Sequence, residues 1–258
     1  MGAGLKRLAA VAANTFRETV RERVLYNLVF FALLMTVSGL LLGQLSIRQD
    51  EKIIKDIGLA AMDLFGTLIA LFVGVGLVAK EVERRSLYPL LAKPLSRDEL
   101  FLGKFLGLSF TLLVNLSVMT AGLYLTLLAT HRHADPSLLK AIYPIFLGLL
   151  LVVALALLFS TLTSSTLAAV CTVALVIAGR YADVIRNMRE VAPGVPDWLI
   201  STIYYALPNF RNFDFKNQVA YGDPVPWTAM AWVTLYACAY VGGVLGLGLF
   251  AWRRRDFV

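Results

Sequence analysis

The chain has 258 residues, of which 59% are hydrophobic and only 16% are charged. Ordinary globular domains are about 45–50% apolar and about 25% charged. A soluble core of this length has no room for the excess, so the composition excludes a typical soluble domain and indicates an integral membrane protein. The formal net charge of +7 then bears on orientation and on contact with anionic lipid, and we expect no nucleic-acid partner.

Residues 1–23 form the first expected element, an amphipathic helix. Apolar residues recur at steps of three and four on one side, and basic residues take the other side. The apolar positions are Leu5, Leu8, Ala12, Phe16 and Val20. This pattern is typical of a helix that lies on the inner membrane face. The alternative is a cytosolic continuation of the first membrane span.

Six stretches are apolar over roughly the 20 residues that a transmembrane helix needs. They are residues 24–45, 58–79, 100–130, 141–163, 166–182 and 227–251. The fifth stretch is short and ends near Arg180. The expected fold is therefore an all-α integral membrane protein, with residues 1–258 forming a single transmembrane domain of six helices.

Lysine and arginine residues near the span ends indicate the orientation. They are more numerous in residues 1–23, 80–104 and 252–258 than in the other connecting segments, which include Arg180 and Lys216. By the positive-inside rule, we expect the three richer segments, and with them both termini, to face the cytoplasm.

Residues 183–226 should then face the outside. The segment is rich in proline and in aromatic residues, among them Trp198, Tyr204 and Tyr205. Its stretch DWLISTIYYAL, which Asp197 begins, predicts a helix that is too short to cross a membrane. We therefore expect short interfacial or re-entrant helices before the last span, and an ordinary ordered loop is the alternative.

The loop between the second and third expected spans, residues 80–99, combines charge with apolar residues. Pro94 ends a short helix, and Ser96 with Glu99 forms a capping-box pattern that starts the third span. A mere connector would not need the apolar residues that this loop places at the cytosolic surface, which are Leu87, Tyr88, Leu90 and Leu91. Exposed apolar residues ringed by charge indicate a docking element for another protein. The alternative is that they rest on lipid headgroups.

This loop resembles the first cytoplasmic loop of type-2 ABC exporter permeases, the membrane subunits of bacterial exporters. That loop has an acidic residue at the end of the second span, a short helix with an "lLskPisR" core and a following Gly-Lys pair. The matching residues here are Glu81, LLAKPLSR at 90–97, and Gly103 with Lys104. The resemblance extends over the whole chain, including LPNF and the basic end RRRDF, and is closest to the permeases of multicopper-enzyme maturation, including that of nitrous oxide reductase. RRS at 84–86 departs from the Gly-Thr pair of many relatives.

The resemblance implies that residues 81–97 contain a coupling helix, which sits in a cleft of a separate ABC ATPase subunit. The residues that would couple to that ATPase are Glu81, Arg84, Arg85, Leu87, Tyr88, Leu90, Leu91, Pro94 and Arg97. The resemblance also implies a second permease copy or paralogue as a dimer partner, and a multi-pass place in the bacterial cytoplasmic membrane.

No G-x-x-x-x-G-K-[ST] motif occurs in the sequence, so we expect no ATP site in this chain. ATP and Mg²⁺ would be bound by the partner ATPase, and the chain itself would be neither an enzyme nor a metal or cofactor protein. Two histidines, His131 and His133, are too few to indicate a metal site. Cys171 and Cys238 are expected to be small buried residues rather than a disulfide.

Asp63 lies in the second expected span, a few residues from its outer end. A carboxylate within a membrane is costly, so Asp63 is a candidate for the translocation path. A wet interfacial residue is an equal alternative.

Small residues form two possible packing faces. One, in the second span, comprises Gly58, Gly66, Ala70 and Gly74; the other is the Gly242-x-x-x-Gly246 spacing of the last span. Either face is consistent with close packing inside one chain or between two chains.

The favoured function is thus the permease subunit of an ABC exporter. An ATP-independent transporter or channel is the first alternative, although neither internal repeats nor several intramembrane charges are visible. A membrane-embedded enzyme is the weaker alternative, because the sequence has no clustered intramembrane carboxylates and no nucleophile beside a base.

Overall fold

The computed structural model describes residues 2–22, 30–31, 34, 50–83, 96–131, 135–182, 184, 196, 198, 201–202, 204 and 207–254. Within these residues every regular element is a helix, which confirms the all-α class. The elements are α1 (Gly2–Glu22), α3 (Asp50–Glu83), α5 (Arg97–His131), α6 (Leu138–Leu162), α7 (Ser165–Arg180), the 3-10 helix η1 (Phe210–Phe213), α11 (Lys216–Tyr221) and α12 (Trp227–Arg254).

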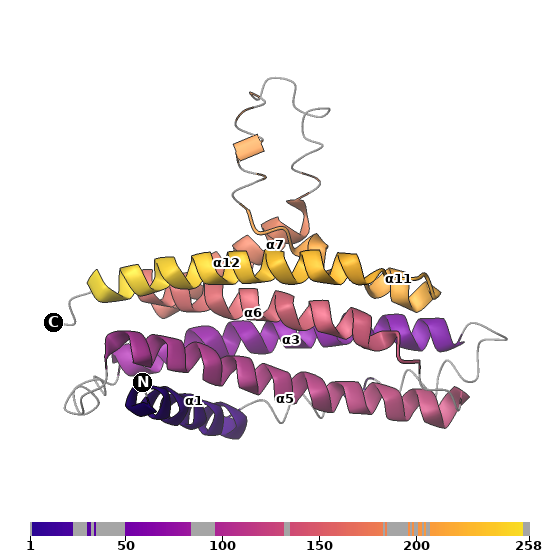
Figure 1. Ribbon diagram of the computed structural model, residues 1–258, viewed down its shortest axis with the longest axis horizontal. Coiled ribbons are helices and arrows are strands. Elements are labelled where there is room, and N and C mark those ends of the chain that lie inside the picture. The colour runs from indigo at the N-terminus through magenta and orange to yellow at the C-terminus, as the bar shows by residue number, and fades with distance from the viewer. Residues whose placement is uncertain are drawn as a thin grey trace.

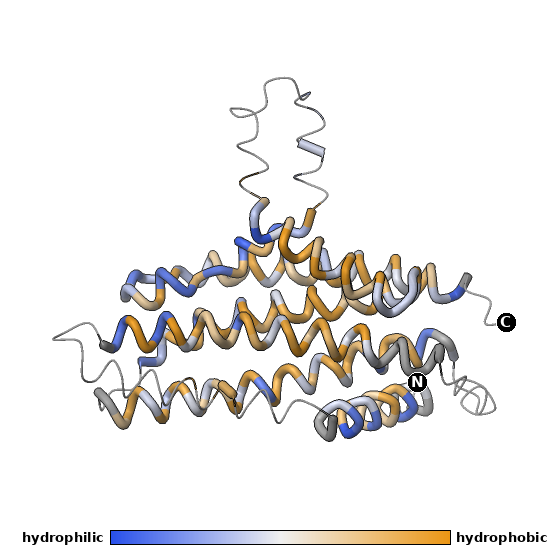
Figure 2. The backbone as a smooth tube through the Cα atoms, turned by 180° about the vertical axis from the view of Figure 1, so that it is seen from behind, coloured by the Kyte–Doolittle hydropathy of each residue, from blue (hydrophilic) through white to orange (hydrophobic). Residues whose placement is uncertain are grey.

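The long helices α3, α5, α6 and α12 lie side by side and give the molecule its elongated shape (Figure 1). Four of the described helices are long and apolar enough to cross a membrane, over Glu51–Gly76, Asp98–Ala129, Leu138–Leu162 and Trp227–Arg253. Hydrophobic residues run along these helices, and hydrophilic residues gather on α1 and near α11 (Figure 2). The second, third, fourth and sixth expected spans are thereby confirmed as apolar helices.

The other two expected spans have different outcomes. The first, residues 24–45, falls outside the described residues except at three helical positions, 30, 31 and 34. The fifth corresponds to α7, which has only 16 residues. At about 1.5 Å per residue α7 is roughly 24 Å long, shorter than the roughly 30 Å hydrocarbon core of a bilayer. The arrangement of all six spans therefore stays a prediction.

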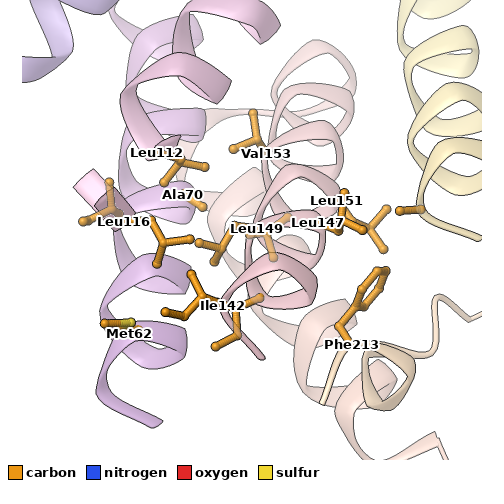
Figure 3. Close-up of a cluster of buried hydrophobic side chains, with 14 of the residues drawn as sticks. Met62, Ala70, Leu112, Leu116, Ile142, Leu147, Leu149, Leu151, Val153 and Phe213 are labelled. Atoms are coloured by element: carbon orange, nitrogen blue, oxygen red, sulfur yellow. The ribbon is translucent and has the colours of Figure 1, made fainter. Parts of the chain in front are cut away.

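Helix α6 is the centre of the bundle. It contacts α3, α5, α7 and α12. Its middle is apolar on every side, which suits a helix that neighbours surround. Leu149, Leu151 and Val153 point from α6 in different directions into the buried cluster, toward α3, α5 and Phe213 (Figure 3). The continuous run of leucine, valine and alanine in this segment is the sequence feature that fits such an all-round burial.

The small residues of α3 allow α6 to approach closely. A Cβ atom added at Gly66 would lie 2.6 Å from the Leu149 side chain, and one at Gly74 would lie 2.8 Å from the Ala156 Cβ. This face therefore packs inside the chain. By contrast, Cβ atoms added at Gly242 and Gly246 of α12 would meet nothing within 4 Å.

The N-terminal helix α1 packs against the first half of α5. Its expected helical state is confirmed. Its contact surface on α5 is a Gly103-x-x-x-Gly107 spacing, which was not among the predicted packing faces. A Cβ added at Gly103 would lie 2.7 Å from Val11, and one at Gly107 would lie 2.7 Å from both the Ala12 carbonyl oxygen and the Thr15 Cβ. Close backbone approach of this kind requires glycine. The position of α1 relative to a membrane stays a prediction.

The start of α5 confirms the predicted capping box. The Ser96 N–H donates to Glu99 Oε2 at 3.1 Å, and the Glu99 N–H donates to Ser96 Oγ at 3.2 Å. Arg253, near the end of α12, forms a two-pronged ion pair with Asp98. The start of α5, the end of α12 and the start of α1 therefore lie at one end of the bundle (Figure 1).

Candidate functional site

The chain leaves α7 partway along the bundle and returns to the same place. The described chain is continuous as far as Ala182 and becomes continuous again at Leu207. Pro208 and Phe210 pack directly on Gly179 near the end of α7. A Cβ at Gly179 would collide with the Pro208 carbonyl oxygen and lie 2.7 Å from the Phe210 ring. Glycine at this position therefore lets the returning segment close against the helix end.

Two tyrosines of α12 hold the returning segment, which contains the LPNF sequence. The Asn209 N–H donates to the Tyr236 hydroxyl at 2.7 Å, and the Tyr240 hydroxyl donates to the Leu207 carbonyl oxygen at 3.2 Å. Phe213 is buried and lies 3.5 Å from a Cβ built at Gly148 of α6. Residues 207–213 are thus packed against α6, α7 and α12. The choice between an interfacial, a re-entrant and an ordinary loop arrangement for residues 183–226 stays a prediction.

Asp63 is bound by two cations at this place. The Arg180 guanidinium donates to both Asp63 carboxylate oxygens, at 2.7 and 2.9 Å, and Lys216 Nζ donates to Asp63 Oδ2 at 2.6 Å. Arg180 also donates to the Thr67 hydroxyl at 3.1 Å. Bidentate contact between a guanidinium and a carboxylate fixes geometry as well as charge. Asp63, Arg180 and Lys216 are called the ion cluster below.

The ion cluster lies deeper than the sequence indicated for Asp63. Helix α3 starts at Asp50, earlier than the expected span, so Asp63 is near the middle of the apolar stretch Glu51–Gly76. Its side chain is only 15% exposed. Unpaired charges inside a bilayer cost about 2.5–3.5 kcal/mol on insertion scales, so the two cations compensate a carboxylate that would otherwise be strongly unfavourable.

A cavity of about 1130 Å³ opens beside the ion cluster. Its walls come from α3, α6, α12, the end of α7 and residues 209–218. The apolar floor is one face of α6, formed by Ile145, Gly148, Leu149 and Val152. The polar rim includes Asn209, Arg211, Asn212, Asp214, Asn217 and Gln218. Ligand pockets commonly measure about 300–1,000 Å³, so this cavity has room for a molecule larger than a simple metabolite.

Two exposed aromatic residues stand at the edge of the cavity. Trp232 of α12 is 70% exposed and Tyr181 is 63% exposed, and both line the cavity. Tryptophan and tyrosine favour places where apolar and polar surroundings meet. The cavity therefore combines an apolar floor, a charged interior and an aromatic edge.

A second group of polar residues lies at the end of the bundle opposite the capping box and joins the elements there. Lys55 of α3 bridges Glu51 at 2.7 Å and Asp135 at 2.6 Å, and the Tyr124 hydroxyl donates to the Asp135 carbonyl oxygen at 2.9 Å. Partial burial acts to raise the pKa of Asp135, but hydrogen bonds from Lys55 and Ser137 outweigh it and hold that pKa below its usual range. This group links α3 to the connection between α5 and α6.

Most of the predicted coupling residues lie outside the described residues: Arg84, Arg85, Leu87, Tyr88, Leu90, Leu91 and Pro94. Glu81 and Arg97 belong to the end of α3 and the first position of α5, respectively, and only their backbone is described. The structure thus places the two ends of this loop at the bundle end that carries the Asp98–Arg253 pair. The docking role of the loop stays a prediction.

The other single-residue predictions have mixed outcomes. Cys171 and Cys238 are free thiols, and Cys171 is half-buried. The expectation that Cys238 is buried is wrong, because it lies on the exposed side of α12. Tyr205 and His133 lie outside the described residues, as does most of the helix expected at 197–207.

The partners of Asp63 could not be found from sequence. Arg180 is 117 positions away and Lys216 is 153 positions away, and no local pattern links them. The sequence offers only a weak signal for the pair: Asp63 is an isolated acid in one apolar segment, and Arg180 is an isolated cation at the end of another.

The apolar helices define a multi-pass membrane protein. The chain belongs to the family described as ABC-2 family transporter protein, whose model matches residues 9–179, so it is an ABC transporter permease. The match runs from within α1 to Gly179 of α7, so it covers Asp63 and the cavity floor. Arg180, Lys216 and the rim lie outside it. No curated protein matches the chain.

Proposed function

We propose that this chain is the permease subunit of an ABC exporter, and that it forms the translocation path and is driven by a separate ATPase subunit. The family match over residues 9–179 carries the proposal, since permeases of this family generally work with an ABC ATPase. ATP and Mg²⁺ would be bound by that partner, and this chain would catalyse no reaction itself.

The proposed coupling element is the connection between α3 and α5. The two helices approach it at the end of the bundle where α1 and the last residues of α12 also lie (Figure 1). We assign this end to the cytoplasm because lysine and arginine gather there. Leu87, Tyr88, Leu90 and Leu91 would fill a cleft of the ATPase, and Glu81, Arg84, Arg85, Pro94 and Arg97 would shape and anchor the loop.

The ion cluster and its cavity would form part of the path on the outward side. The cavity is large and mixed in character, as expected for a site that holds cargo. Asp63 would then line the path rather than serve as an interfacial residue. In the complete assembly two permease chains, identical or paralogous, with six spans each, would rock between inward- and outward-facing arrangements in a bacterial cytoplasmic membrane.

Co-purification tests the proposal against an ATP-independent transporter or channel. The tagged full-length chain, extracted from its native membrane in a mild detergent, should retain an ABC ATPase subunit that mass spectrometry identifies. The mass of the complex should correspond to two permease chains and two ATPase chains. Recovery of an intact, folded permease with no ATPase would contradict the proposal and favour the alternative class. The relation to the permeases of multicopper-enzyme maturation is proposed only from the resemblance of the loop.

A further inference from the structure

We propose that the cavity beside the ion cluster binds an anionic amphiphile, with its phosphate or carboxylate head next to Lys216 and Arg180 and its hydrocarbon chain along the α6 floor. Only the interpretation of this molecule as transported cargo rests on the proposed exporter function. Its binding is a separate claim, which can be tested without ATP or a partner subunit.

Charge selects an anion. The cavity lining contains three cations, Arg180, Arg211 and Lys216, against two carboxylates, Asp63 and Asp214. Both Arg180 and Lys216 are held by the single carboxylate of Asp63, and Asp214 reaches Lys216 only at 3.6 Å. The interior therefore has one formal positive charge in excess. Arginine and lysine donors in a partly dehydrated site bind phosphate or carboxylate oxygens strongly.

The apolar floor selects an amphiphile over a soluble anion. Leu149 and Val152 line the cavity and are buried in α6. They lie one to two helical turns after Ile145, toward the C-terminal end of α6. A small hydrated anion would gain nothing from these side chains, whereas a hydrocarbon chain gains about 25 cal/mol for each Å² of apolar surface that leaves water.

The depth and orientation suit a lipid-like molecule. Tyr236, which anchors the rim through Asn209, is about 14 Å along α12 from Trp227, at roughly 1.5 Å per residue. The cavity thus reaches from the start of the span into the depth of acyl chains. With the α6 start on the outer side, the head would lie at the ion cluster, level with the middle of α3, and the chain would extend from there along α6. Exposed Trp232 would stand where the molecule enters from the bilayer.

Quenching of Trp232 by brominated amphiphiles tests this inference. A full-length version with Trp198, Trp227 and Trp252 replaced by phenylalanine leaves Trp232 as reporter, and circular dichroism checks its helix content. The protein is placed in phosphatidylcholine nanodiscs containing dibrominated phosphatidylglycerol, dibrominated stearate or dibrominated phosphatidylcholine. We expect the two anionic probes to quench at roughly five-fold lower mole fraction than the zwitterionic one. The better of the two identifies a glycerophosphate or a carboxylate head.

Substitutions of charged residues should change the preference for anionic probes in a predictable direction. Lys216→Gln removes the excess positive charge and should abolish the preference, and Lys216→Arg should retain it. Lys52→Gln is the matched control, because Lys52 is outside the cavity lining and lies over the Tyr221 ring, and it should behave as the unmodified protein.

Three results would each overturn the inference. One is equal quenching by anionic and zwitterionic probes. Another is a preference that survives Lys216→Gln unchanged. The third is displacement of the brominated lipid by millimolar inorganic phosphate, which would show a site for a soluble anion. A retained preference in a chain that co-purifies with no ATPase would leave the binding site established and refute the exporter assignment alone.

Discussion

Asp63 and Arg180 are 117 residues apart in the sequence, and two hydrogen bonds of 2.7 and 2.9 Å join their side chains. The pair fastens the end of the short helix α7 to the middle of α3. Lys216 adds the start of α11 through a third contact of 2.6 Å. One carboxylate therefore fixes the positions of three elements that the connecting chain alone does not align.

Removal of this carboxylate should destabilise the fold. Asp63→Ala leaves Arg180 and Lys216 without their shared carboxylate. Loss of one partner of a fully buried ion pair commonly costs about 3–5 kcal/mol, and the partial exposure of Arg180 makes the expected cost smaller. We expect a clearly lower unfolding temperature in detergent, followed by the loss of helical circular dichroism. Asp223→Asn, at an exposed position between α11 and α12, is the control. An unchanged transition for Asp63→Ala would mean that the ion cluster does not hold α7 in place.

The glycines of α5 and α12 should respond in opposite ways to the same substitution. Gly107→Ala places a methyl group against Ala12 and Thr15 and should loosen α1, which limited proteolysis of the N-terminus would detect. Gly242→Ala enters open space and should be neutral or stabilise α12 by up to about 1 kcal/mol. If Gly242→Ala instead dissociates a permease dimer in size-exclusion chromatography, this face of α12 is the contact between two chains. Equal protection of α1 in Gly107→Ala would contradict the packing described here.

Acidification should weaken the group around Asp135. A carboxyl group whose pKa is lower in the folded state contributes stability above its unfolded pKa of about 4, and loses it as pH falls through the folded value. Hydrogen bonds from Lys55 and Ser137 lower the pKa of Asp135 against the opposing effect of burial. Stability should therefore fall between about pH 5 and pH 2, and Asp135→Asn should lose part of that dependence. Fluorescence-monitored unfolding across this range provides the comparison, and identical pH profiles would exclude a contribution from Asp135.

The proposed orientation predicts which cysteines an impermeant thiol reagent can reach. In a background with Cys171 and Cys238 replaced by alanine, a cysteine at position 223 should be labelled from the outside of intact cells. A cysteine at position 95 should be labelled only after the membrane is opened. Outside labelling at position 95 would refute the cytoplasmic placement of the loop.

The docking loop should be sensitive to changes in its apolar residues. Tyr88→Ala or Leu90→Asp should lower ATPase binding and transport while membrane insertion stays normal, because a buried aromatic or aliphatic anchor at an interface commonly contributes about 2 kcal/mol or more. Single replacements at Arg84 or Arg85 should have smaller effects. Tyr221→Ala removes an exposed tyrosine from the opposite end of the bundle and is the matched control. Normal ATPase stimulation in Leu90→Asp would favour a loop that merely rests on headgroups.

Local patterns predicted local structure well. The Ser96–Glu99 pair starts α5 as expected, and long apolar runs form α3, α5, α6 and α12. The patterns were less informative on which side of an apolar helix faces inward. Cys238 was placed inside because its neighbours are apolar, but membrane helices are apolar on exposed sides as well, so hydrophobicity does not report burial there.

The ion cluster lay beyond sequence reasoning for a different reason. Asp63, Arg180 and Lys216 meet only because α7 stops early and the chain comes back to its end. Neither the stopping point nor the return has a local signature, except for Gly179, whose missing side chain makes room for Pro208. Long-range pairs of this kind require the folded arrangement of the helices to be known.

Because α7 stops early, the cavity is lined on one side by a long helix and on the other by a short connecting stretch. Its floor is a face of α6, which four neighbouring helices constrain and where any change of side-chain volume would disturb the whole core. Its rim is a short stretch, residues 209–218, in which Arg211, Asn212, Asn217 and Gln218 are exposed. Phe210, Phe213 and Lys216 of the same stretch are held by the bundle. Under the proposed function, exchange of these four exposed positions would change the preference for cargo, while the side chains that hold the stretch on the bundle remain as they are.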